Sequence, residues 1–236
     1  MRKKKCGAIV LAAGSGSRMG SETKKQYMLL GDKPIVYYPL KVFQESFIEE
    51  IVLVVSAGDV DYCRKEIVER YGFGKVRHIV EGGRERYDSV AAGLRAADCD
   101  FVFIHDGARP FPTQEMLERL LQCVEREGAC VAGMPVKDTV KIAGADGCIA
   151  STPDRRSVWQ VQTPQVFAYD LIRNAYECLM EKKDELAAQG VAVTDDAMVV
   201  EHFAGHKVRL VEGSYENIKI TTPEDIRIAA ALLGEC

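Results

Sequence analysis

The 236-residue sequence lacks several patterns that would assign it to a specialised class of protein. Its eight cysteines form no Cys-x-x-Cys pair and no Cys/His cluster with the spacing of zinc ligands, so we interpret them as reduced residues of a cytoplasmic protein. No apolar run approaches the roughly 20 residues of a membrane span. The apolar run that follows Arg2 to Lys5 is short, and a buried first strand explains it better than a signal peptide does.

A strong charge imbalance and a nucleophile–base arrangement are also missing. The net charge of -4 gives no reason to expect nucleic acid or a membrane surface as a partner, so an anionic ligand would need a local group of Arg and Lys. None of the four histidines has a plausible Ser or Cys partner, and none lies in a nucleophile elbow. These absences favour a reaction in which the substrate supplies its own nucleophile.

Strand-like and helix-like patterns alternate along the first 135 residues. The expected strands are 8–12, 51–55, 76–80, 101–105 and 129–135, and the expected helices are 34–43, 60–71, 88–97 and 114–126. This alternation predicts an α/β fold with three α/β/α layers around a mostly parallel sheet. Continuous apolar strands fit burial on both faces of that sheet. We expect one domain covering residues 1–236.

The pattern changes at residues 136–158. Two short β-like segments, 139–143 and 148–152, are joined by Gly144-Ala145-Asp146-Gly147, a hairpin signal, which predicts a β-arm projecting from the sheet. The expected elements that follow are helices at 170–186, 195–202 and 223–233 and strands at 207–211 and 217–220. Thr222 is the expected N-cap of the last helix.

Three loops of unusual composition follow the first, third and fourth strands, at residues 12–20, 81–86 and 105–110. Because parallel strands share polarity, the loops should open on one crevice. The first is rich in glycine, which lets backbone N–H groups surround phosphate oxygens, and Arg18 and Lys25 add positive charge. Its G-x-G-x-x-x-G spacing matches neither the dinucleotide fingerprint nor the P-loop.

Asp106 follows its strand directly and should lie at the rim of the crevice. Such an aspartate serves Mg²⁺, a ribose hydroxyl or a substrate hydroxyl, although an ion pair with Arg109 is an alternative. We interpret His105 as a structural residue that supports the loop by a hydrogen bond. A phosphate monoester is largely dianionic at neutral pH and needs no general base. Arg, Lys and a Mg²⁺-bound triphosphate would suit its attack on an α-phosphate.

The motifs together resemble those of the 2-C-methyl-D-erythritol 4-phosphate cytidylyltransferase family, nucleotidyltransferases with a Rossmann-like core. The resemblance covers residues 8 to about 230 and rests on residues 12–20, Lys25-Gln26, Gly82-Gly83-x-x-Arg86-x-x-Ser89-Val90, residues 105–110, Thr163-Pro164-Gln165 and residues 217–221. It implies transfer of CMP from CTP to 2-C-methyl-D-erythritol 4-phosphate, giving 4-diphosphocytidyl-2-C-methyl-D-erythritol and pyrophosphate. The substrate phosphate would attack the α-phosphate directly.

The resemblance also implies a role for each matching residue. Arg18 and Lys25 would be catalytic, and the nucleotide would contact Ala12, Ala13, Gly14, Gly16, Gly83 and Ser89. The substrate hydroxyls would meet Asp106, Arg109 and Thr139, and its phosphate would be held by Arg155, Thr194 and Lys219. Mg²⁺ would be bound mainly by the triphosphate, with Asp106 as a candidate ligand. A homodimer is implied in which the arm crosses to the second subunit, so that Arg155 would act in the partner's site.

Some positions and some rival functions stay open. Gly107 stands where the family usually has Ala, and Arg84 occupies a position that is acidic in some relatives. Thr194 is also a candidate helix N-cap. The rival functions are a cytidylyltransferase for ribitol 5-phosphate or another polyol phosphate, a non-catalytic nucleotide-binding protein and a dinucleotide oxidoreductase. Because the chain ends soon after the last expected helix, we expect no fused second enzyme.

Overall fold

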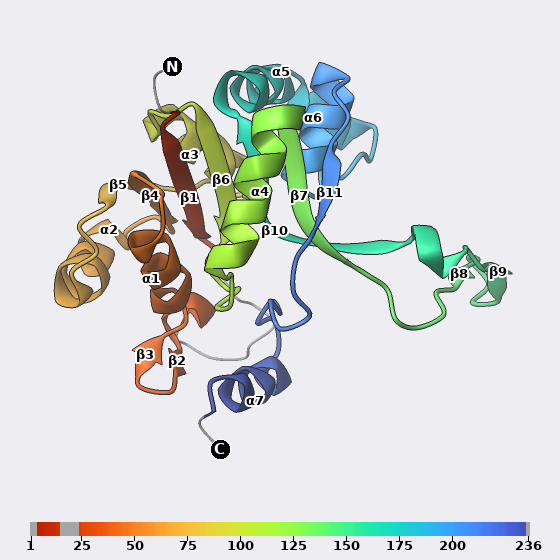
Figure 1. Cartoon of the computed structure of the whole chain (residues 1–236). Coiled ribbons are helices and arrows are strands. Elements are labelled where there is room, and N and C mark those ends of the chain that lie inside the picture. The colour runs from red at the N-terminus through yellow and green to blue at the C-terminus, as the bar shows by residue number, and fades with distance from the viewer. Residues whose placement is uncertain (1–3, 15–23, 235–236) are drawn as a thin grey trace.

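The computed structural model describes residues 4–14 and 24–234, and it is built on one large twisted sheet (Figure 1). The seven strands lie in the order β11-β7-β10-β6-β1-β4-β5. Their bounds are Cys6–Ala12 (β1), Glu50–Val55 (β4), Val76–Glu81 (β5), Phe101–Asp106 (β6), Ala129–Pro135 (β7), Trp159–Ala168 (β10) and Arg209–Glu212 (β11). The five strands expected in the first 135 residues are all present, and the mostly parallel α/β fold is confirmed.

Strand β10 is the element that the sequence pattern did not reveal. It lies between β6 and β7 and is antiparallel to both, whereas the other neighbouring strands pair in parallel. Pro164 lies in its middle, where proline cannot donate a ladder hydrogen bond and argues against a central strand. The Thr163–Pro164 peptide is cis, and the pairing with β7 shifts register between Val161 and Gln165. Within the Thr163-Pro164-Gln165 motif, Gln165 pairs with Ile104 of β6, and Thr163 Oγ1 accepts from the N–H of Asp106 at the end of β6.

Helices cover both faces of the sheet. The helices have the bounds Tyr37–Glu45 (α1), Val60–Tyr62 (α2), which continues as the π-helix η3 (Cys63–Glu69), Arg86–Ala96 (α3), Gln114–Glu127 (α4), Tyr169–Ala188 (α5) and Asp196–Ala204 (α6). One apolar core contains side chains of α1, η3 and α4, and the other contains side chains of α3, α5 and α6. The expected three-layer arrangement is therefore present. Among the described residues, no helix combines the length and the apolar character needed to cross a bilayer.

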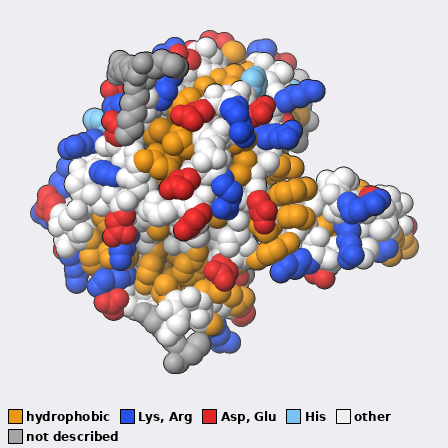
Figure 2. Space-filling model, in the orientation of Figure 1, with side chains coloured by type: hydrophobic (Ala, Val, Ile, Leu, Met, Phe, Trp, Pro, Cys, Tyr) orange, Lys and Arg blue, Asp and Glu red, His pale blue; other side chains and the backbone are white. Residues whose placement is uncertain are grey.

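The polypeptide between β7 and β10 leaves the sheet as the expected arm (Figure 1). Its hairpin strands are shorter than predicted, at Ile142–Ala143 (β8) and Ile149–Ser151 (β9), and a one-turn 3₁₀ helix, η4 (Arg155–Ser157), lies between β9 and β10 in the chain. The side chains of Ile142 and Ile149 are 52% and 65% exposed. Hydrophobic side chains also gather where the arm meets the body, and Lys and Arg lie along the arm (Figure 2).

A small third core joins the last helix to the N-terminal region. Helix α7 (Pro223–Leu232) packs with the hairpin of β2 (Leu29–Leu30) and β3 (Lys33–Pro34), with Ile220 fully buried between them. The capping box of Thr222 with Asp225 confirms the predicted N-cap. Two predictions here were wrong. Pro34 pairs in β3 and α1 begins only at Tyr37, while residues 217–220 form an irregular segment in place of a strand.

Candidate active site

Two adjoining cavities lie at the carboxyl ends of β1, β5 and β6. The first, of about 510 Å³, is lined by residues that include Ala12, Ala13, Gly14, Lys25, Gly83 and Ser89. The second, of about 360 Å³, is lined by residues that include Arg109, Gln162, Thr163, Gln165 and Thr194. Arg86, Asp106 and Lys219 line both cavities. The three loops therefore open on a common crevice, as their sequence positions predicted.

The residues expected to be functional fall into four groups. Of the residues expected at the nucleotide, the described ones line the first cavity, and the second is lined by Asp106, Arg109, Thr194 and Lys219. Thr139 and Arg155 lie on the arm, exposed, and line neither cavity. Arg18 and Gly16 lie outside the described residues. A single chain thus brings together every described candidate except the two on the arm.

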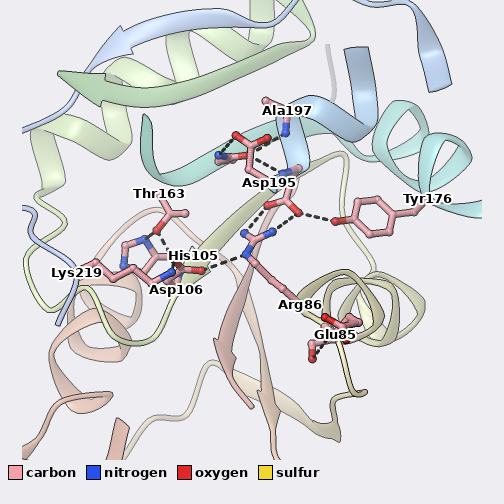
Figure 3. Close-up of polar contacts among 12 residues, drawn as sticks. Glu85, Arg86, His105, Asp106, Thr163, Tyr176, Asp195, Ala197 and Lys219 are labelled. Atoms are coloured by element: carbon pink, nitrogen blue, oxygen red, sulfur yellow. Dashed lines mark hydrogen bonds and ion pairs between the residues drawn. The ribbon is translucent and has the colours of Figure 1, made fainter. Parts of the chain in front are cut away.

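Asp106 is held between two cations. Its Oδ2 accepts from Lys219 Nζ at 2.7 Å, and its Oδ1 lies 3.4 Å from Arg86 Nε (Figure 3). Burial alone would raise the pKa of Asp106, but the charges of Arg86 and Lys219 outweigh burial and hold that pKa below its usual range. Asp106 is therefore a fixed carboxylate at neutral pH. The alternative ion pair with Arg109 is not the arrangement found, because Arg109 Nη1 donates to the carbonyl of Asn217 at 2.8 Å.

His105 supports the loop, as expected. Its Nε2 lies 3.0 Å from the Arg109 carbonyl, and its Nδ1 lies 3.1 Å from Thr163 Oγ1. Because a carbonyl only accepts, Nε2 carries the proton and Nδ1 accepts from the Thr163 hydroxyl, which in turn accepts from the Asp106 N–H at 3.1 Å. Burial lowers the pKa of His105 to about 4, so the ring is neutral in this arrangement.

Arg86 was only a motif position in the sequence, and the structure places it at the centre of the site. Its Nη1 and Nη2 donate to the two carboxylate oxygens of Asp196 at 2.8 and 2.7 Å (Figure 3). Asp196 is fully buried and also accepts from the hydroxyl of Tyr176 at 2.6 Å. Sequence reasoning had a usable signal for Arg86 in the Gly82-Gly83-x-x-Arg86 spacing, but none that linked it to a residue 110 positions away.

Hydrogen bonds hold the segment that contains Lys219 in place on both sides of this residue. Asn217 is fully buried, and its Nδ2 donates to the Thr163 carbonyl at 2.8 Å. The N–H of Ile220 donates to the carbonyl of Ala108 at 2.9 Å. Between these anchors Lys219 is half-buried and reaches Asp106. This explains why the irregular segment after β11 matters although it forms no strand.

Lys25 begins a one-turn 3₁₀ helix, η2 (Lys25–Tyr27), at the mouth of the first cavity. Gln26 is buried and its Nε2 donates to the Ala12 carbonyl at 2.6 Å, which ties this turn to the end of β1. Lys24 forms an ion pair with Asp59 at 2.7 Å and is absent from the lining of the first cavity. The turn is therefore anchored on both sides of Lys25.

The second loop lies close to the first because it contains glycine. A Cβ on Gly82 would lie 2.7 Å from the Cβ of Ala13, and a Cβ on Gly83 would collide with Asp88. The following helix α3 begins with a capping box formed by Glu85 and Asp88.

The prediction that Thr194 caps the N-terminus of α6 was wrong. Asp195 is the N-cap, and its side chain accepts from the Met198 N–H at 3.0 Å.

The described residues do not fit a magnesium site made by the protein alone. Within them, no three His, Cys, Asp or Glu side chains are grouped so that they could hold a metal ion. Both oxygens of Asp106 already face cations, so a metal ion bound there would lie close to the positive charges of Lys219 and Arg86. Asp106 is therefore a poor fit for the candidate metal ligand that the sequence suggested.

Comparison with known proteins identifies the family. The family model described as "IspD: 2-C-methyl-D-erythritol 4-phosphate cytidylyltransferase" matches residues 6–235. The chain belongs to this family. It is 50% identical over 230 residues to the 2-C-methyl-D-erythritol 4-phosphate cytidylyltransferase of Lachnoclostridium phytofermentans, covering 97% of this chain and 96% of that protein. The same enzyme of Lachnospira eligens is 50% identical over 228 residues, covering 96% and 98%.

Solved structures of IspD family members share the fold. The 4-diphosphocytidyl-2C-methyl-D-erythritol synthase of Anaerococcus prevotii superposes with a TM-score of 0.83 at 37% identity, covering 98% of this chain and 96% of that one. The 2-C-methyl-D-erythritol 4-phosphate cytidylyltransferase of Thermus thermophilus gives a TM-score of 0.74 at 30% identity, covering 96% and 98%. The fold and the family expected from the motifs are therefore both confirmed.

Proposed function

We propose that this chain transfers CMP from CTP to 2-C-methyl-D-erythritol 4-phosphate, forming 4-diphosphocytidyl-2-C-methyl-D-erythritol and pyrophosphate. The observation that carries the proposal is a pair of adjoining cavities with a common wall of Arg86, Asp106 and Lys219, in a member of the IspD family. Two anionic reactants bound in the two cavities would meet at this wall.

The first cavity suits the nucleotide. Backbone from the β1 loop and from the loop at Gly82 and Gly83 approaches closely there, and Lys25 supplies positive charge. In our proposal Ala12, Ala13, Gly14, Gly16, Gly83 and Ser89 contact CTP, and Arg18 and Lys25 stabilise the transition state at the α-phosphate.

The second cavity suits the polyol phosphate. Asp106 is ionised and can accept from a substrate hydroxyl, and Arg109 and Thr194 lie around the same space. Lys219 and Thr194 would hold the phosphate, and Asp106, Arg109 and Thr139 would meet the hydroxyls. Asp106 also limits where the phosphate can lie, because its own negative charge repels an anion.

The proposed reaction needs no general base to deprotonate the acceptor. A phosphate oxygen of the acceptor forms a bond to the α-phosphorus of CTP while the bond to the β-phosphate oxygen breaks, and pyrophosphate leaves with that electron pair. The dianionic acceptor is already deprotonated at neutral pH. The protein's tasks are to align the two reactants and to neutralise charge.

IspD cytidylyltransferases are a class of enzyme that uses a divalent cation. We propose that Mg²⁺ enters with CTP and is bound mainly by triphosphate oxygens, where it lowers the negative charge on the nucleotide. Chelation with EDTA should lower the initial rate of pyrophosphate release by more than about 100-fold, and added Mg²⁺ should restore it. An EDTA-resistant rate in metal-free buffer would contradict this part of the proposal.

We further propose that the chain acts as a homodimer through its arm. Thr139 and Arg155 lie on the arm, exposed and outside the lining of both cavities of their own chain, while Ile142 and Ile149 present apolar surface to solvent. An arm that reaches a second subunit would bury this surface. It would also bring Arg155 to the phosphate of the acceptor in the partner's site.

The experiment that tests the function is a substrate panel. Purified protein is incubated with CTP and Mg²⁺ plus either 2-C-methyl-D-erythritol 4-phosphate or ribitol 5-phosphate, and pyrophosphate release is measured. We expect turnover with the methylerythritol substrate and little with ribitol 5-phosphate. Turnover with ribitol 5-phosphate alone would replace our substrate by its closest rival. Saturable NADH binding without turnover of either polyol phosphate would favour a dinucleotide-binding protein.

A further inference from the structure

A buried carboxylate behind the site has no contact with either cavity. Asp196 lies in the first turn of α6, is fully buried, and is absent from the lining of both cavities. It nevertheless makes two hydrogen bonds to Arg86, which lines both. A two-point contact between a guanidinium and a carboxylate fixes the direction of the planar guanidinium group as well as its position.

The surrounding structure fixes Asp196 in turn. Gln165 Oε1, on β10, accepts from the N–H groups of Asp196 and Ala197 at 3.0 and 2.9 Å. The Tyr176 hydroxyl, on α5, donates to Asp196 Oδ1. Figure 3 shows the Tyr176 side chain pointing toward the start of α6, where Asp195 and Ala197 are labelled. Gln165 therefore fixes the backbone at Asp196, while Tyr176 and Arg86 fix its carboxylate before any ligand binds.

The guanidinium of Arg86 is only partly used by these contacts. Of its five N–H groups, two serve Asp196 and the one on Nε faces Asp106 at 3.4 Å. Within residues 4–14 and 24–234, no hydrogen bond from its other N–H groups is found. The side chain is 28% exposed, so its free edge is open to the place where the two cavities join.

We infer that Asp196 is a positioning residue: it orients Arg86, which together with Lys219 fixes the Asp106 carboxylate for the acceptor's hydroxyl groups. The inference rests on the proposed function. Arg86 and Lys219 contact opposite oxygens of Asp106, so both are needed to define its rotamer. Without the two-point contact to Asp196, the Arg86 guanidinium can rotate away from Asp106. The Asp106 carboxylate is then held by Lys219 alone and can change its rotamer.

A purely structural role explains the geometry less well. A pair of apolar side chains would join α3 to α6 at a lower cost in free energy. Burying the charges of Arg86 and Asp196 removes them from water, which offsets much of their mutual attraction. Tyr176 and Gln165 add hydrogen bonds that orient the start of α6 and the Asp196 carboxylate. Through Asp196, these contacts orient the guanidinium of Arg86 toward the site, which packing alone does not require.

The first test is Asp196→Asn, which preserves shape but leaves one accepting oxygen. We expect the KM for 2-C-methyl-D-erythritol 4-phosphate to rise about tenfold while the KM for CTP changes less than about twofold. Glu50→Gln is the matched control. Glu50 is a buried carboxylate, 6% exposed, that pairs with Lys5 at 2.8 Å at the opposite end of the sheet, and its loss should lower thermal stability without changing either KM.

A double-mutant cycle shows whether Asp196 acts through Arg86. In an Arg86→Lys background, which cannot make the two-point contact, Asp196→Asn should change the acceptor KM by less than about twofold. An undiminished effect in that background would overturn the inference. So would an Asp196→Asn enzyme that loses only thermal stability, as Glu50→Gln does.

Tyr176→Phe keeps the test decisive if Asp196→Asn does not fold. Removing the hydroxyl loosens Asp196 without removing its charge, so the acceptor KM should rise by about two- to threefold. An unchanged acceptor KM in a folded Tyr176→Phe enzyme would then overturn the inference. Wild-type enzyme assayed in parallel separates the two proposals. If the wild type shows no turnover, the proposed function is wrong. If the wild type turns over normally and the variants have the same acceptor KM, only the role of Asp196 is wrong.

Discussion

The two halves of the proposed acceptor site are built differently. On the sheet side, Asp106 is 8% exposed and Asp196 fully buried, and both belong to a chain of ion pairs that includes Arg86 and Lys219. On the arm side, Thr139 and Arg155 are exposed, and the hydrogen bond found for the Arg155 guanidinium runs to the Lys137 carbonyl at 3.1 Å. The sheet side is preorganised within one chain, whereas in our proposal the arm side becomes a site only when it meets a second subunit.

The largest effect should come from the charge closest to the chemistry. Lys25→Ala should lower kcat by about 100-fold or more, because it removes stabilisation that matters most in the transition state. Lys24→Ala is the matched control, since Lys24 already pairs with Asp59, and its kcat should fall by no more than a few-fold. Steady-state kinetics of pyrophosphate release measure both. A Lys25→Ala enzyme with a raised KM and a normal kcat would not agree with the assigned role.

The arm half can be tested by complementation between chains. Arg155→Ala should lower kcat/KM for the acceptor by more than about tenfold. Mixing it with Lys25→Ala, after subunit exchange, should restore about a quarter of wild-type activity, since each mixed dimer contains one complete site. If the mixture stays as inactive as its components, Arg155 acts in its own chain or not at all.

On the sheet side, Lys219→Ala should chiefly weaken binding of the polyol phosphate. We expect an increase of about tenfold in its KM, with a much smaller change in kcat, because the lysine pairs with Asp106 and, in our proposal, holds the acceptor's phosphate. Lys219→Arg keeps the charge and should recover part of the loss. An acceptor KM that is the same in Lys219→Ala as in wild type would remove Lys219 from the site.

The last prediction concerns stability rather than activity, and it distinguishes buried from exposed groups. Because burial lowers the pKa of His105 to about 4, the unfolded chain binds its proton from pH 6.5 downward while the folded chain does not. The free energy of unfolding should therefore fall as the pH drops from 6.5 to 4, by up to about 3 kcal/mol from this group. Asp106, whose pKa is held low, keeps its charge through this range.

Urea denaturation at a series of pH values measures the effect. His105→Gln should show a weaker dependence on pH between 6.5 and 4, and the exposed His202→Gln should behave as wild type. An equally steep fall in His105→Gln would assign the effect to other groups.

The sequence predicted most of the fold because its strands are apolar and its helices alternate with them. It failed where local pattern and tertiary position disagree. Strand β10 contains Pro164 and pairs antiparallel in the middle of a parallel sheet, so neither composition nor alternation marked it. Pro34 looked like the first turn of a helix but lies in a hairpin strand that packs near α7.

The site was predictable wherever its residues follow strand ends. Loops after parallel strands must converge, which placed Lys25, Gly83 and Asp106 together, and the family motifs added Arg109 and Lys219. The sequence did not predict the pairing of Arg86 with Asp196, because these residues lie 110 positions apart and no local spacing encodes such a contact. Arg18 and Gly16 lie outside the described residues, and their roles remain predictions.

The most direct test of the account is a crystal structure of the protein with its product, 4-diphosphocytidyl-2-C-methyl-D-erythritol. We predict that the cytidine lies in the cavity bounded by Ala13, Gly83 and Ser89, with the polyol beside Asp106 and Arg109. The diphosphate should cross the wall between the two cavities, within reach of Lys25 and Lys219. A product bound with its polyol outside the second cavity, or with its diphosphate away from that wall, would contradict the account.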